Sequence, residues 1–336
     1  MSKQPSGSDR FRTVVDVPRN PASISHQSTI LSIGSCFAEH IGTRLSNNHF
    51  ATCRNPTGIL YNPESIGMLL DGLLHRQAYR EDDLIDHAGA FYSFDHHGAF
   101  CGGNKAETLE RINRAWAQAR HWATGLDTLL VTLGTAWVYR LKSTGRVVAN
   151  CHKMPHDSFE RHLLEPTEIA QALGDCLQKY VHRTPCLNII LTISPVRHLR
   201  DNPHANSVSK AHLMTAVFQL EQQIANVYYF PAYEIMMDEL RDYRFYECDM
   251  VHPSKVAQQY IWDGFCRACI DRRAREFIDG YTAILNARHH RIQQSAAPST
   301  RHFAQKQLQR VRQLQSTFPH ISLQGDADYF SGLCAS

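Results

Sequence analysis

Short apolar runs alternate along the chain with longer segments in which apolar residues recur every three or four positions. The short runs predict buried strands, and the longer segments predict amphipathic helices. The predicted strands are Thr29–Ile33, Asp127–Leu133, Leu187–Ser194 and Val227–Phe230. The first predicted helix begins just after Ser35. The others cover Ile66–Leu74, Ala106–Trp122, Glu165–Tyr180, Ser207–Ala225 and Pro253 to about Arg273. This alternation is typical of an α/β fold with a parallel sheet and helices on both faces.

The segments between these elements carry other patterns. Residues 81–104 show no clear period and predict irregular structure or short strands. Trp137–Leu141 and Arg146–Ala149 flank a Ser-Thr-Gly turn, which indicates a hairpin. We therefore expect a polar N-terminal arm (residues 1–28), a main domain (residues 29–275) and a basic, peripheral helical extension (residues 276–336).

Composition excludes several classes of protein. The chain has 336 residues, 43% of them hydrophobic, and no apolar run approaches the roughly 20 residues that a bilayer span requires. The formal net charge is only +3, so we do not expect a dedicated nucleic-acid binder. The basic C-terminal extension is read as a solvated helix, with a partner- or RNA-binding tail as the alternative. The first residues lack the apolar core of a signal peptide, which predicts a cytoplasmic protein.

The ten cysteines are scattered through apolar segments, and we expect buried, reduced thiols. Cys266 and Cys269 form the one close pair, on a predicted helix. Neither a second pair nor a histidine cluster stands near them in sequence, so we predict no metal site.

Polar residues follow the predicted strands at the ends where parallel sheets bind ligands. The first strand runs into Gly34-Ser35-Cys36, the second into Gly134-Thr135, and the third into Ser194 and the residues up to His198. Arg197 and His198 could bind a carboxylate, sugar or phosphate, or they could serve as capping and packing residues. We expect the functional site at this edge of the sheet.

Ser35 stands between a strand and a helix, where a turn exposes the hydroxyl and the helix N-terminus favours a developing negative charge. The same position also suits a simple N-cap. Asp249 and His252 stand three residues apart just before a helix, so one short loop can bring both side chains together. Serine, aspartate and histidine in this chain order can build a Ser-His-Asp site.

Cys36 offers a second nucleophile beside Ser35, because a helix N-terminus can lower the pKa of a thiol. Side chains one residue apart on a turn point in different directions, so one of the two faces the core. We take Ser35 as the nucleophile and keep Cys36 as the alternative.

The segment ILSIGSCFAEHIG (Ile30–Gly42) resembles the signature of the GSCFA family. Further segments resemble that family, in chain order NPTGILYNPESI, TLGTAWVY, NCHKMP, SPVRH and YFPAYEIMMDELRDYRFYECDMVHPS. The resemblance covers roughly Phe11 to Arg273. The family is similar to the SGNH (GDSL-like) hydrolases, which implies a flavodoxin-like, three-layer α/β/α fold and ester cleavage by a Ser-His-Asp site.

The resemblance also implies roles for individual residues. It makes Ser35 the nucleophile, His252 the base and Asp249 the residue that orients the base. SGNH enzymes use a glycine N–H and an asparagine side chain in the oxyanion hole, and Gly58 matches the first of these. The second falls in the block that starts at Gly134, where Ala136 stands at the asparagine position. The candidates for the missing donor are Asn55, Asn150 and His152.

We therefore expect a serine esterase that cleaves a small-molecule or carbohydrate ester, for example an O-acyl group, without a metal or organic cofactor. The alternatives are an acyltransferase that uses the same site and a ligand-binding protein that has kept the fold without catalysis. The departure at Ala136 favours the binding protein, since loss of one oxyanion donor costs about 10²–10³ in rate.

Overall fold

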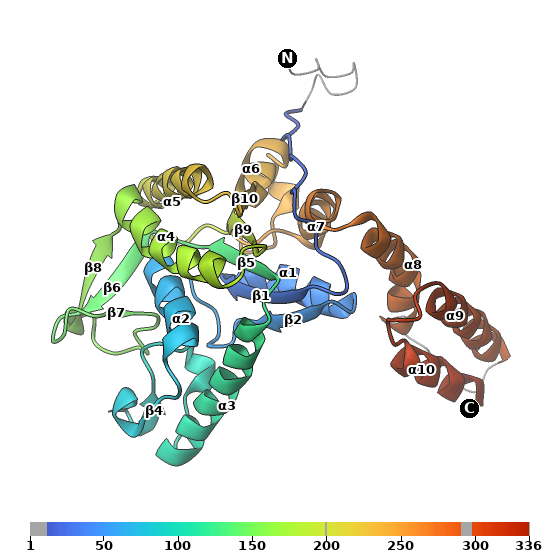
Figure 1. The fold of residues 1–336 in the computed structure, drawn as a ribbon, viewed down its shortest axis with the longest axis horizontal. Coiled ribbons are helices and arrows are strands. Elements are labelled where there is room, and N and C mark those ends of the chain that lie inside the picture. Colours follow the sequence, from blue (N-terminus) through green and yellow to red (C-terminus); the bar gives the residue numbers. More distant parts are fainter. Residues whose placement is uncertain (1–11, 199, 290–297, 336) are drawn as a thin grey trace.

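The centre of the molecule is a five-stranded parallel sheet (Figure 1). The computed structural model describes residues 12–198, 200–289 and 298–335. The strands run in the order β10-β9-β5-β1-β2. Their bounds are Thr29–Gly34 for β1, Ala51–Arg54 for β2, Thr128–Leu133 for β5, Asn188–Ile193 for β9 and Val227–Phe230 for β10. The α/β prediction and its strands are confirmed.

The edge strand β2 was not predicted. Its sequence, Ala-Thr-Cys-Arg, is short and only partly buried, because β2 pairs with β1 alone. A strand on the edge of a sheet needs fewer apolar residues than one buried on both sides, so the apolar pattern is weak there.

Helices cover both faces of the sheet and give it two separate apolar cores. Leu31, Ile33 and Val131 pack on one face against four helices, and Ile30, Leu130 and Ile190 pack on the other against two. The first face carries α2 (Pro63–His75), α3 (Lys105–Thr124), α4 (Pro166–Arg183) and α5 (Pro203–Gln223). The second carries α1 (Cys36–Asn47) and α7 (Lys255–Cys269). The protein therefore has the three-layer α/β/α architecture.

Two small antiparallel units project from this body. Ile85–His87 (β3) and Ala90–Tyr92 (β4) form a hairpin in the segment predicted to be irregular. Trp137–Leu141 (β6) pairs with Val147–Val148 (β7), as the turn signal predicted. An additional strand, Phe159–Leu163 (β8), pairs with the other side of β6.

The last predicted helix of the main domain is in fact two helices. Helix α7 ends at Cys269, and α8 (Arg272–His289) begins after a break at Ile270. There Ile270 forms a bridge with Ile24, and Ile24 N–H donates to the Cys269 carbonyl at 2.7 Å. The N-terminal arm therefore packs along the end of α7 and interrupts the helix that the sequence pattern extended to Arg273.

The C-terminal extension is helical, as predicted, and lies at one side of the body (Figure 1). Its helices are α8, α9 (Pro298–Thr317) and α10 (Gln324–Ala335), and Phe277, Phe318 and Phe330 lie in their shared apolar cluster. Helix α8 also contributes Ile278 to the core under α1 and α7. Across the described ranges, every helix is too short or too polar to cross a membrane.

Candidate active site

The turn from β1 into α1 depends on Gly34. This residue has φ +137°, a conformation that residues with a side chain rarely adopt. A Cβ at this position would lie 2.1 Å from the Thr132 carbonyl oxygen of the neighbouring strand β5. Gly34 therefore lets the chain turn tightly against β5, and the next two residues fall at the carboxyl edge of the sheet.

Ser35 is the N-cap of α1. Its Oγ accepts a hydrogen bond from the Phe37 N–H at 3.2 Å, and its own N–H donates to the Thr132 carbonyl at 3.2 Å. The residue is only 1% exposed. The structure thus places the predicted nucleophile beneath the surface, in a capping role that the sequence analysis named as its alternative.

Cys36 is the first residue of α1, and it is partly exposed. Burial raises the pKa of its thiol, while hydrogen bonds from the N–H groups of Phe37 and Cys36 and the charge of Lys210 act in the opposite direction. The thiol therefore stands at the N-terminus of the helix, in the electrostatic field of the buried Lys210.

The predicted Asp249–His252 pair is formed. His252 Nδ1 lies 2.6 Å from Asp249 Oδ2, and the N–H groups of Val251 and His252 both donate to Asp249 Oδ1 at 2.9 Å. These bonds, led by the one from the His252 N–H, lower the pKa of Asp249 to about 2. The carboxylate accepts the Nδ1–H of His252, which leaves Nε2 as the basic nitrogen.

His252 lies near two other histidines at the sheet edge. Partial burial lowers the pKa of His40, and the nearby charges of Arg44 and His252 lower it further. Burial lowers the pKa of His198 to about 4, with the charges of Lys210 and His252 adding to the effect. His40 is one helical turn beyond Cys36, so the charge of His252 acts on the first turns of α1.

Lys210 of α5 is the residue that the sequence analysis missed. Its side chain is fully buried, and its Nζ donates to the carbonyls of Gly134 and Ser194, both at 2.7 Å. Burial lowers its pKa to about 7. Lys210 precedes the buried Leu213 and Val217 by three and seven positions, so helical periodicity alone marks it as a lysine on the core side of its helix.

Three predicted oxyanion residues are engaged with the local backbone. Gly58 N–H donates to the Asn55 carbonyl, and Gly134 N–H donates to the Tyr61 carbonyl, both at 2.7 Å. The Asn55 side chain accepts from Gly34 N–H at 2.9 Å and donates to Glu39 at 3.0 Å. These residues brace the turn on which Ser35 and Cys36 stand.

Ala136, at the position where SGNH enzymes carry asparagine, is fully buried in the core. Its N–H donates to the Ser209 Oγ at 2.8 Å, and that hydroxyl also pairs with Thr135 at 3.0 Å. Ser209 and Lys210 thus tie the ends of β5 and β9 to α5 at the place of the expected donor.

The Asn150–Lys153 loop contacts another part of the molecule. Asn150 accepts from the His152 N–H at 2.9 Å, and His152 Nε2 pairs with the Ser93 carbonyl at 2.7 Å. The His152 ring packs on Tyr92, 4.7 Å between centroids. Asn150 and His152 therefore contact their own loop, β4 and the residues just after β4. Arg197 is exposed, and its guanidinium lies 3.5 Å from the Met237 sulfur.

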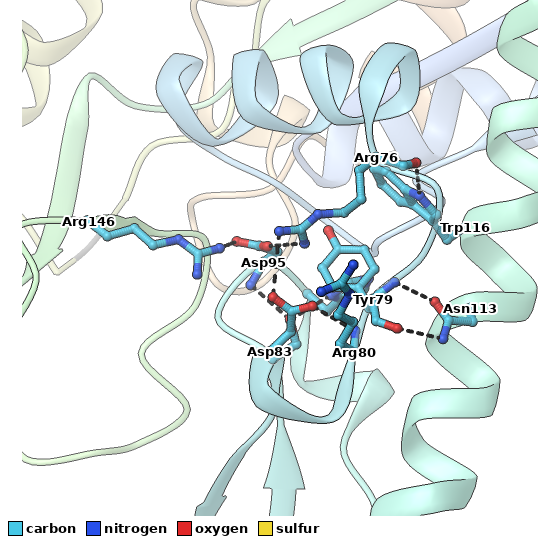
Figure 2. A network of polar contacts seen from close by, with 10 residues as sticks. Arg76, Tyr79, Arg80, Asp83, Asp95, Asn113, Trp116 and Arg146 are labelled. Atoms are coloured by element: carbon cyan, nitrogen blue, oxygen red, sulfur yellow. Dashed lines mark hydrogen bonds and ion pairs between the residues drawn. The ribbon is translucent and has the colours of Figure 1, made fainter.

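A separate polar network braces this neighbouring region (Figure 2). Arg76, at the end of α2, lies over the Tyr79 ring at 4.3 Å and forms ion pairs with Asp83 and Asp95. Arg146 also pairs with Asp95. The network fixes the segment that leads to His97, whose Cβ would meet a side chain at Gly58. It supports the loop beside the site and contains none of the predicted site residues.

A cleft of about 780 Å³ runs along α1 from Cys36 to Asn47. Helix α7 supplies Lys255, Gln259 and Trp262 to its walls, and α8 supplies Thr282. Cys36 lines this cleft, and Ser35 does not.

Comparison with known proteins decides the family. A family model described as the GSCFA family matches residues 29–265. The chain belongs to the GSCFA family. Neither the curated proteins nor the solved structures with which the chain was compared gave a match.

The GSCFA match contains β1, the Asp249–His252 loop and most of α7, and it ends before α8. The candidate site residues of this GSCFA protein therefore lie within the matched segment, whereas the cleft wall formed by α8 lies outside it. Cys266 and Cys269 are buried in α7, and within the described part of the chain there is no cluster of three or more potential metal ligands.

Proposed function

We propose that this GSCFA protein is an ester hydrolase of the SGNH type that works through a covalent acyl-enzyme. The observation that carries the proposal is the Asp249–His252 pair, whose Nδ1 and Oδ2 atoms lie 2.6 Å apart and whose histidine acts electrostatically on His40 in α1 and on His198 after β9. A carboxylate that holds a histidine, next to a helix start that carries nucleophilic side chains, is the arrangement used in acyl transfer.

The chemistry follows from this geometry. His252 takes the proton of the nucleophile through Nε2, and Asp249 stabilises the imidazolium that forms. The N-terminal N–H groups of α1 point toward the negative charge that develops on the carbonyl oxygen. His252 then returns the proton to the departing alcohol. The family resemblance assigns the nucleophile to Ser35. An acceptor hydroxyl in place of water would make the same site an acyltransferase.

The cleft supports a polar substrate. Most of its lining can form hydrogen bonds or carries charge, and Trp262 is its one large aromatic side chain. The lining comprises Glu39, His40, Thr43, Arg44, Asn47, Asn48, Lys255, Gln259, Trp262, Thr282 and Asn286, with Cys36, Ile59, Ile278 and Leu285. Such a surface suits a hydroxyl-rich molecule, such as an acylated carbohydrate, better than a long alkyl chain.

A non-catalytic ligand-binding protein is the second candidate. It is favoured by the engaged N–H of Gly58 and by the buried Ala136 in place of an asparagine. Such a protein would use the same cleft without turning its ligand over.

Hydrolysis of p-nitrophenyl acetate and of acetylated sugars separates the two. We expect turnover by the wild-type protein and a loss of about 10³–10⁴-fold in kcat for His252→Gln and Asp249→Asn. His182→Gln, a change to an exposed histidine near the end of α4, is the control and keeps full activity. Saturable binding of an acetylated sugar without turnover would support the binding protein instead.

A further inference from the structure

Two nucleophilic side chains follow Gly34, and only one of them opens onto the cleft. We propose that Cys36, rather than Ser35, is the nucleophile of the site, so that the covalent intermediate is a thioester. The inference rests on the proposed acyl chemistry and changes the residue that carries it.

Ser35 is poorly placed to attack. Its Oγ is already the acceptor for the Phe37 N–H, and the residue is 1% exposed. To reach a substrate the hydroxyl would have to leave the cap, which costs about 1 kcal/mol of helix stability, and become exposed. Its backbone N–H is also held by Thr132. Ser35 is thus a positioning residue that fixes the first turn of α1.

Cys36, unlike Ser35, opens onto the cleft and is therefore accessible to a substrate. It stands at the first helical position and lines the cleft together with His40 and Lys255. Its sulfur therefore stands at the start of α1, where the N–H groups of the first helical turn have no partner within the helix. A carbonyl carbon bound to that sulfur would place its oxygen next to these N–H groups, where an oxyanion is stabilised.

Ionisable groups surround the thiol from several elements. Lys210 of α5, which donates to the carbonyls of Gly134 and Ser194, acts electrostatically on the thiol, and so does Tyr61 of the segment after β2, whose pKa is raised by burial and by Cys36. The Tyr61 ring meets the His198 ring edge-on at 5.3 Å between centroids. His252 lies near both His40 and His198. Cys36 is therefore one member of a cluster and not an isolated cysteine.

The proposed reaction needs only the ester and water as reactants. The thiol is protonated at rest, so His252 Nε2 accepts the S–H proton as the sulfur attacks the ester carbonyl and the S–C bond forms. The tetrahedral intermediate collapses, the C–O bond breaks, and His252 gives its proton to the departing alkoxide. Water, deprotonated by His252, then attacks the thioester. The C–S bond breaks, a carboxylic acid leaves, and the sulfur regains its proton.

Variants at the two positions distinguish the nucleophiles. We expect Cys36→Ala to lose at least about 10³-fold in kcat and Cys36→Ser to retain a small fraction of the activity. Ser35→Ala and Ser35→Gly should lower kcat by less than tenfold, because both remove the hydroxyl and glycine largely preserves the cap. Circular dichroism and thermal melting verify that each variant is folded.

Trapping identifies the bond itself. The exposed Cys186 and Cys248 are first replaced by serine, because they would also react with thiol reagents. The protein is mixed with p-nitrophenyl acetate, quenched in acid and digested, and the peptide that contains both Ser35 and Cys36 is analysed by mass spectrometry. We expect an acetyl group on Cys36 that neutral hydroxylamine removes, as for a thioester. We also expect stoichiometric alkylation of Cys36 by iodoacetamide, with loss of activity and with protection by substrate.

The outcomes separate the inference from the proposed function. An acetyl group on Ser35 that resists neutral hydroxylamine, with activity surviving in Cys36→Ala, would overturn the inference and leave the hydrolase standing. Wild-type protein that neither turns over esters nor traps an acyl group would overturn both.

Discussion

At the scale of single residues, Gly34 decides whether the site can exist. Its backbone conformation and its approach to the Thr132 carbonyl both exclude a side chain. Asn55 holds its N–H from the other side at 2.9 Å. These contacts to the Gly34 backbone therefore fix the turn, and the turn sets the directions in which the Ser35 and Cys36 side chains point.

Gly34→Ala should destabilise the protein by at least about 3 kcal/mol, because it combines backbone strain with a backbone clash at 2.1 Å. The measurement is the free energy of unfolding in urea. Gly125→Ala is the matched control, since a Cβ there meets no atom within 4 Å, and we expect a change below about 0.5 kcal/mol. Similar stabilities for the two variants would contradict this account of the turn.

At the scale of elements, the segment between β4 and α3 holds a buried, neutral histidine. His96 is 1% exposed, its Nδ1 pairs with the Ser93 hydroxyl at 3.0 Å, and its Nε2 has no hydrogen-bond partner among the described residues. The Tyr79 and Phe100 rings pack around it, at 4.7 and 5.1 Å between centroids. Burial, followed by the charge of Arg76, lowers its pKa to about 3.

This burial makes stability depend on pH. The unfolded chain takes up a proton near the usual histidine pKa of about 6.5 and the folded chain does not, so the stability is complete above that pH and is lost as pH falls toward 3. Between pH 7 and pH 5 the loss due to His96 amounts to about 2 kcal/mol.

Urea unfolding at several pH values tests this dependence. His96→Phe, which keeps a ring between Tyr79 and Phe100, should show a shallower decline than wild type across this range. His121→Gln, a change on the exposed surface of α3, should decline as wild type does. An equal decline in His96→Phe would mean that His96 is not the group responsible.

The sequence predicted the elements better than it predicted the site. Buried strands such as Leu187–Ser194 are mostly apolar, so their pattern is strong, whereas β2 lies at an edge and carries little pattern. The Asp249–His252 pair could be predicted because it is local in sequence. The directions in which the Ser35 and Cys36 side chains point could not be predicted from the sequence. They depend on how closely Gly34 approaches a carbonyl of β5, nearly one hundred residues away along the chain.

At the scale of the whole molecule, the C-terminal extension is part of the cleft. Helix α8 supplies Ile278, Thr282, Leu285 and Asn286 to the wall that faces α1. Ile278 holds α8 there by packing in the core under α1 and α7. The Phe277 ring also contacts the His26 ring of the N-terminal arm and the His49 ring that follows α1, at 4.8 and 5.8 Å between centroids. The main domain alone would leave this side of the cleft open.

Thr282→Trp should therefore narrow the cleft without touching the reacting groups. If the protein hydrolyses esters, we expect kcat/KM for an acetylated oligosaccharide to fall about tenfold or more and that for p-nitrophenyl acetate to change less than twofold. Gln309→Trp, at an exposed position on the outer helix α9 and away from the cleft lining, is the control. An equal fall for both substrates would show that the substitution disturbs the site itself.

The cleft wall on α8 begins after residue 265, where the family match ends, so the proposed reacting groups and this wall are encoded in different stretches of the gene. Sequence changes after residue 265 alter the cleft wall on α8. They leave the sheet, the N-terminus of α1 and the Asp249–His252 loop unchanged. Two family members with unlike tails would then share one reaction and differ in what they accept. If the proposed function holds, the sequences of these tails would sort family members by substrate more finely than their common domain does.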